Sequence, residues 1–191
     1  MAGDNGVVYM YNLNKQEIYH EINTWKDSGP IYNVKYDYGC NNFGACSQKG
    51  IFYIYSAHDS QLIFQKNFNK PISNFVWRAD GTEVFLVDKK YDVPPKEQKL
   101  FQEDNFGTGS FLIRLAWHTN KVEYVKKISS NDIWSVDLSS DEILIIIGDN
   151  YGDLFLIQAN TGIILYRYQV LHTNFINCVK FLKQESNNKL I

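Results

Sequence analysis

The run GDNYGDLFLIQANTG, residues 148–162, places acidic and amide side chains around a glycine. Asp149, Asn150 and Asp153 offer oxygen atoms of the kind that bind Ca²⁺. An EF-hand loop also needs a bidentate glutamate at its twelfth position, and counting from Asp149 that position is Asn160. The residues between them alternate as in a strand. The pattern therefore predicts a turn between two strands, with Asp149 capping the turn through its own backbone, and no metal site.

Nucleophilic catalysis would need a serine, cysteine or threonine beside a base that a third group orients. The sequence has no GxSxG elbow, and its histidines fall at or near the ends of expected strands: His20, His58, His118 and His172. The cysteines are odd in number and lack CxxC spacing, which indicates neither a disulfide framework nor a zinc site: Cys40, Cys46 and Cys178. We therefore predict no catalytic, cofactor-binding or metal-binding residue, and no enzyme activity.

Composition limits the partners. The formal net charge of −2 supplies no broad cationic field for phosphate groups, so nucleic acid is an unlikely partner. The densest apolar run, Ile143–Ile147, is far shorter than the roughly 20 residues of a membrane-spanning helix. The stretch Val7 to Tyr11 is shorter and more polar than a signal-peptide core. We expect a cytoplasmic protein that does not cross a membrane.

A glycine followed by alternating aromatic and aliphatic residues recurs along the chain. The spacings between successive copies are 44, 59 and 43 residues, so one unit has about 43 residues and one unit carries an insertion. The copies are Gly6–Asn12, Gly50–Ser56, Gly109–Leu115 and Gly152–Gln158. A second apolar motif recurs in phase with the first, at Pro30–Tyr36, Pro71–Trp77, Asp132–Leu138 and Phe175–Phe181. Two further strand-like segments per unit, separated by turn residues, predict four short strands per repeat.

Four short antiparallel strands per repeat describe a β-propeller blade, and the fold class is expected to be all-β. Here the chain resembles the WD-repeat family, although its strands end in Tyr11-Asn12, Tyr55-Ser56 and Ile157-Gln158 where that family has Trp-Asp. The resemblance implies four-stranded blades around a central channel, with about seven blades in a ring. About four blades are represented here, so we expect part of a larger ring. The expected division is a half blade at 1–28, blades at 29–69, 70–129 and 130–170, and a first strand within 171–191.

The strands expected at the two ends of this arrangement, Val7 to Tyr11 and Phe175 to Phe181, would have unpaired backbone groups. Natural proteins usually cover such edges. We therefore predict that the two strands pair with each other, or that another chain or segment completes the propeller.

The insertion at 91–107 lies between the second and third expected strands of its blade. Adjacent prolines favour an extended backbone, and apolar side chains there need a packing site or a partner. The candidate residues of a partner-binding loop are Pro94, Pro95, Leu100, Phe101 and Phe106. Packing of this loop on its own blade is the alternative.

The expected function is a scaffold for protein–protein interaction within a larger cytoplasmic assembly, for example a cytoskeletal or ciliary complex. One alternative is an enzyme with its site in the propeller channel, because residues 152–166 also resemble the blades of quinoprotein dehydrogenases, which carry calcium and a quinone. The other is a nucleic-acid-associated scaffold with a basic rim.

Overall fold

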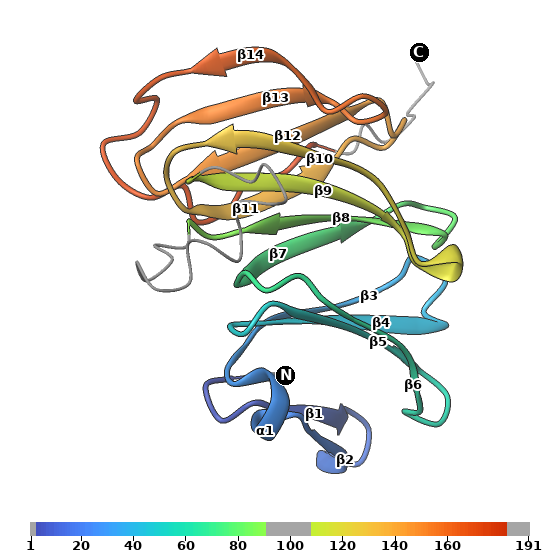
Figure 1. Ribbon diagram of the computed structural model, residues 1–191. Helices are drawn as coiled ribbons and strands as arrows, with labels where there is room; N and C mark the ends of the chain where they lie inside the picture. Colours follow the sequence, from blue (N-terminus) through green and yellow to red (C-terminus); the bar gives the residue numbers. More distant parts are fainter. Residues whose placement is uncertain (1–2, 91–107, 183–191) are drawn as a thin grey trace, which may run out of the picture.

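A computed structural model describes residues 3–90 and 108–182 of the 191-residue chain (Figure 1). Within these residues regular structure is almost entirely β, which confirms the predicted fold class. The helical elements are one turn each, α1 (Trp25–Ser28) and the 3-10 helix η2 (Trp117–Thr119). No described helix is long or apolar enough to cross a bilayer.

The strands form one two-stranded and three four-stranded antiparallel sheets, each in chain order. The two-stranded sheet contains β1 (Val7–Asn12) and β2 (Glu17–Asn23). The next contains β3 (Ile31–Tyr36), β4 (Asn42–Ser47), β5 (Ile51–Ser56) and β6 (Leu62–Asn67). The third contains β7 (Ile72–Trp77), β8 (Glu83–Asp88), β9 (Ser110–Ala116) and β10 (Lys121–Ser129). The last contains β11 (Ile133–Leu138), β12 (Leu144–Asp149), β13 (Leu154–Gln158) and β14 (Ile163–Tyr168).

One turn design recurs between the second and third strands of every four-stranded sheet. The last residue of the second strand accepts hydrogen bonds from backbone N–H groups that follow it: Ser47 from Ile51, Asp88 from Phe111, and Asp149 from Tyr151 and Asp153. Asp149 Oδ1 lies 2.9 Å from both of its donors. The predicted role of Asp149 as a turn cap is confirmed.

The sheets stack face to face, and the core lies between them (Figure 1). The first strands of the four-stranded sheets, β3, β7 and β11, lie next to one another. Alternation along each strand sends one set of side chains to the preceding sheet and the other set to the following sheet. In β13, Phe155 and Ile157 pack on the β7–β10 sheet, whereas Leu154 and Leu156 lie on the opposite side. The described sheets form an open stack and no closed ring.

The segment predicted as a further strand at Phe175 to Phe181 is not a regular strand. It follows β11 through separate contacts: Ser135 Oγ donates to the Ile176 carbonyl at 2.8 Å, and Phe181 N donates to Asp137 Oδ2 at 2.9 Å. Ile176 N also donates to the Asp149 carbonyl at 3.0 Å. A regular strand needs a continuous backbone ladder with a neighbouring strand, and the described residues of this segment provide isolated bonds instead.

Candidate interaction surface

The five loop residues predicted to bind a partner lie outside the described residues: Pro94, Pro95, Leu100, Phe101 and Phe106. Their segment joins β8 to β9, the second and third strands of one sheet. The described residues at its two ends show how the segment is attached to the scaffold.

Two buried residues of opposite charge, Asp88 and Lys70, lie at the base of this segment. Asp88, the last residue of β8, accepts a hydrogen bond from Phe111 N at 2.6 Å, and Lys70 Nζ lies 4.2 Å from the centre of the Phe111 ring. Burial raises the pKa of Asp88 to about 7, although the Phe111 N–H and the Lys70 charge oppose the rise. Burial likewise lowers the pKa of Lys70, and the Asp88 charge opposes that change.

Lys89 lies between two aromatic rings from neighbouring sheets. Its Nζ is 4.0 Å from the centre of the Tyr32 ring on β3 and 3.5 Å from that of the Trp134 ring on β11. Both distances are within the range of cation–π attraction. Lys89 therefore fixes the start of the insertion to the strands on either side of β7.

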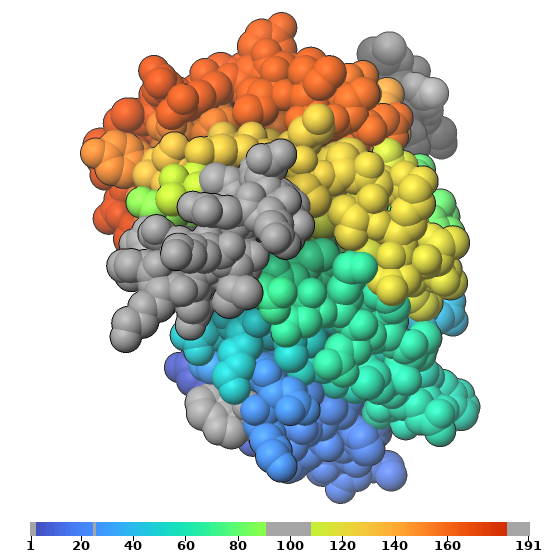
Figure 2. Space-filling view, viewed as in Figure 1, coloured from blue at the N-terminus to red at the C-terminus, as the bar shows by residue number. Residues whose placement is uncertain are grey.

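One apolar face of the β11–β14 sheet is open along its outer strand, whereas residues 175–181 lie over its inner part, where Ile176 approaches Gly148 and accepts a hydrogen bond from Ser135 Oγ. The side chains of this face point away from the β7–β10 sheet, and we call this surface the β14 face: Ile146, Leu154, Leu156, Tyr166 and Tyr168. Tyr166 is 61% exposed and Tyr168 is 47% exposed. The strand β14 reads IILYRY, and all six of its residues are exposed. In Figure 2, β13 and β14 form the orange end of the molecule, opposite the blue end with β1 and β2.

The corresponding face of each preceding four-stranded sheet is covered. Phe64 on β6 and Tyr124 on β10 hold the position that Tyr166 holds on β14. Each pairs with a residue of the third strand of its sheet: Phe64 with Ile54, Tyr124 with Arg114, and Tyr166 with Leu156. Phe64 packs edge-on against Trp117 of the next sheet, with ring centres 6.3 Å apart. Tyr124 Oη donates to the Ala159 carbonyl of the next sheet at 2.7 Å. In the described part of the chain no sheet follows β14, so Tyr166 lacks such a neighbour.

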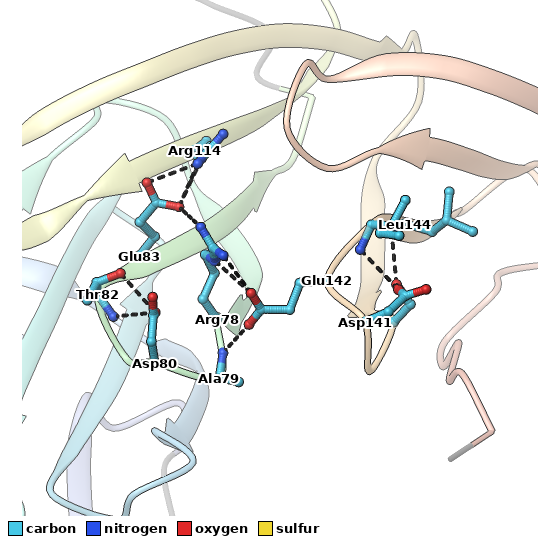
Figure 3. Close-up of polar contacts among 11 residues, drawn as sticks. Arg78, Ala79, Asp80, Thr82, Glu83, Arg114, Asp141, Glu142 and Leu144 are labelled. Atoms are coloured by element: carbon cyan, nitrogen blue, oxygen red, sulfur yellow. Dashed lines mark hydrogen bonds and ion pairs between the residues drawn. The ribbon is translucent and has the colours of Figure 1, made fainter. Parts of the chain in front are cut away.

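A network of ion pairs joins the turns of two sheets at another rim (Figure 3). Arg78, after β7, binds Glu83 of β8 at 3.1 Å and Glu142 of the β11–β12 turn at 2.6 Å. Glu83 also binds Arg114 of β9 at 2.9 Å. Glu142 accepts a further hydrogen bond from the backbone N of Ala79. These half-buried charges are all paired with one another, so their evident role is to hold the two sheets together.

The first strands carry polar side chains that link sheet to sheet. Asn33 Nδ2 donates to Asn74 Oδ1, and Asn74 Nδ2 donates to the Trp134 carbonyl, each at 3.0 Å. Lys35 Nζ donates to Asn74 Oδ1 at 2.7 Å and to the Phe75 carbonyl at 2.6 Å. Burial, and next the charge of Lys180, lower the pKa of Lys35 to about 8.

A channel active site would bring carboxylates and a histidine together on these first strands. Asp137, which binds Lys180 Nζ at 2.8 Å, is the carboxylate that β3, β7 and β11 contribute. The four histidines lie elsewhere, on β2, after β5, in η2 and after β14: His20, His58, His118 and His172. Among the described residues, no group of three or more His, Cys, Asp or Glu side chains is placed to hold a metal ion.

Comparison of the sequence with protein-family models and with curated proteins gives no match.

Sequence reasoning predicted the interaction site in the insertion and did not identify the β14 face as a candidate surface. The composition of the outer strands carries a signal for this surface. Among the outer strands, β10 contains four charged residues and β2 contains two, whereas β14 contains only Arg167 and β6 only Lys66. An outer strand that is apolar on both sides indicates a covered surface.

Proposed function

We propose that the chain is a protein–protein interaction scaffold of the β-propeller kind, and that it binds through the β14 face. The open apolar face carries this proposal. Burial of a large apolar side chain contributes about 1.5–3 kcal/mol, so the exposed Tyr166 and Tyr168, beside partly buried apolar side chains of the same face, favour a protein partner. Tyrosine is also enriched in protein interfaces, since it combines a large apolar ring with a polar end.

The WD-repeat resemblance supports a setting in a larger cytoplasmic assembly, of which a cytoskeletal or ciliary complex is an example. Stiff sheets carry loops and faces that bind without any catalytic group. The insertion at 91–107 is proposed as a second contact, attached to the scaffold through Asp88 and Lys89.

Affinity capture from cells tests the proposal with two variants of the intact chain. Tyr166→Lys places a charge on the exposed outer strand of the β14 face, and we expect it to lose partners that the original chain retains. Ile63→Lys is the matched control, because Ile63 is an exposed residue of the outer strand β6, away from the β14 face.

Deletion of residues 92–106 separates the two contacts. We expect the deletion to lose a different partner, or to weaken binding further when combined with Tyr166→Lys. Retention of every partner by both variants would contradict the proposed function.

A further inference from the structure

The two-stranded sheet has an exposed apolar face of its own. Val8 and Met10 pack on the β3–β6 sheet, so alternation along β1 points Tyr11 the other way. Ile18 pairs with Tyr11 across β2 and lies on the same side. We call Tyr11, Leu13 and Ile18 the β1 face; they are 41%, 83% and 47% exposed.

Leu13 occupies a position that is buried or partly buried in every four-stranded sheet. It directly follows β1, the strand that Gly6 leads, just as one residue directly follows each of β5, β9 and β13: Ala57, Trp117 and Ala159. Each of these packs on the sheet before it. Ala57 packs on the cluster of Val8 and Met10, Trp117 packs against Phe64, and Ala159 accepts the Tyr124 hydroxyl.

The β14 face and the β1 face are therefore the two halves of one kind of contact. Tyr166 corresponds to Phe64 and Tyr124, and Leu13 corresponds to the residues that those two side chains contact. Both halves are exposed on the same chain, at opposite ends of the stack of sheets (Figure 1). One copy of the described stack cannot bring its own two halves together.

We propose that the β14 face of one copy of this chain binds the β1 face of a second copy, with Tyr166 against the turn at Leu13. The inference rests on the proposed function, because it names the partner of the same face. The contact is heterologous, since each copy uses a different surface. Such contacts close into a ring if the rotation between copies permits, and otherwise extend into a chain of copies.

Light scattering coupled to gel filtration tests the inference with the purified chain alone. We expect the molar mass to rise with concentration from 22.2 kDa to at least twice that value. Tyr166→Lys disables the β14 face and Leu13→Lys disables the β1 face, so each variant by itself should stay at the monomer mass. The control Ile63→Lys should associate like the original chain.

Mixing the two variants gives the decisive result. The intact β14 face of Leu13→Lys can bind the intact β1 face of Tyr166→Lys, so the mixture should regain association although neither variant associates alone. Regained association also shows that both variants are folded. A symmetric contact between two β14 faces predicts instead that Leu13→Lys associates alone, and that result would overturn the proposal.

A monomer mass for the original chain at every concentration up to about 1 mM would likewise overturn the proposal, because even weak specific contacts are populated there. Together with the capture experiment, the molar mass distinguishes failure of the self-association from failure of the proposed function. If the purified chain is monomeric while Tyr166→Lys still loses cellular partners, the face binds another protein and only the self-association is wrong.

Discussion

Asp88 is a carboxyl group buried at the end of β8, beside Lys70 and within reach of the charge of Asp132. Its pKa rises from 3.8 to about 7 on folding. Between these values the native state holds a proton that the unfolded chain has released. The contribution of Asp88 to stability is therefore fully present below about pH 4 and is lost as the pH rises to about 7.

We expect Asp88→Asn to remove this slope. The amide oxygen can still accept the Phe111 N–H, but the side chain no longer titrates. The shift of about three pKa units sets an upper limit of about 4 kcal/mol on the difference between pH 4 and pH 7. Urea unfolding at a series of pH values measures it. A parallel pH profile for the original chain and Asp88→Asn would show that the pKa of Asp88 is not raised.

Glu142 lies in the β11–β12 turn and binds the β7–β8 turn of the neighbouring sheet. Its backbone is in the left-handed conformation, with φ of 59°. Its carboxylate accepts hydrogen bonds from Arg78 Nε and Nη2 and from the backbone N–H of Ala79. We expect Glu142→Ala to lower the free energy of unfolding by about 1–3 kcal/mol, because charge-assisted hydrogen bonds between half-buried groups are lost. Denaturant unfolding measures this loss.

A double-mutant cycle with Arg78→Ala supplies the control for Glu142. The effects of the two substitutions should fall well short of additive, since each removes the same ion pair. Additive losses would mean that the pair contributes nothing to the contact between the sheets.

At the scale of the strand, one glycine position is repeated at the start of the third strands. Gly152 has φ of 85°, and a Cβ atom there would run into the backbone carbonyl of His172. Gly50 has φ of 84° and faces the backbone of Lys70 in the same way. The turn therefore needs glycine for two reasons, its left-handed backbone and the close approach of the chain that follows the fourth strand of the sheet.

We expect Gly152→Ala to destabilise the protein by more than about 2 kcal/mol, because the clash is with backbone atoms that cannot move alone. Gly3→Ala is the matched control, since a Cβ there would meet only Asn5 Oδ1 at 3.9 Å. Thermal unfolding compares the two. Equal midpoints would contradict the account of this turn.

The strand pattern was predictable from sequence because its determinants are local. The glycine positions, the alternating apolar residues and the cap at Asp149 all act within a few residues, and the corresponding elements are present. The irregular path of residues 175–181 was not predictable. Whether a segment becomes a strand depends on a neighbouring ladder, and no pattern within the segment encodes that neighbour.

At the scale of the molecule, the stack of sheets makes burial depend on position in the stack. Tyr124 and Tyr166 have the same residue type at the same strand position, yet one contacts a following sheet and the other is exposed. The sequence of β14 indicates an apolar surface, but only the arrangement of the sheets shows which of its sides is open. The β1 face was hidden from sequence reasoning for the same reason.

We expect hydrogen exchange to follow this arrangement. The strands β4, β8 and β12 each have a paired strand on both sides, so their amides should exchange orders of magnitude more slowly than those of β2 and β14. Exchange measured by mass spectrometry tests this at low protein concentration, where the proposed self-association is not expected. Uniform exchange across all strands would contradict the expected difference between inner and outer strands.

The contacts between the last two sheets are spread along their whole width. The Asn74 side chain reaches β11, Arg78 reaches the next turn, and Tyr124 reaches across at the outer strand. A hinge requires a single line of contact about which two bodies can open. These two sheets are joined at the inner strand, at a turn and at the outer strand, so they have no such line. A pulling force on one sheet would therefore be transmitted to the other without opening the angle between them. Under load the two sheets should move as one rigid body and then separate in a single cooperative step.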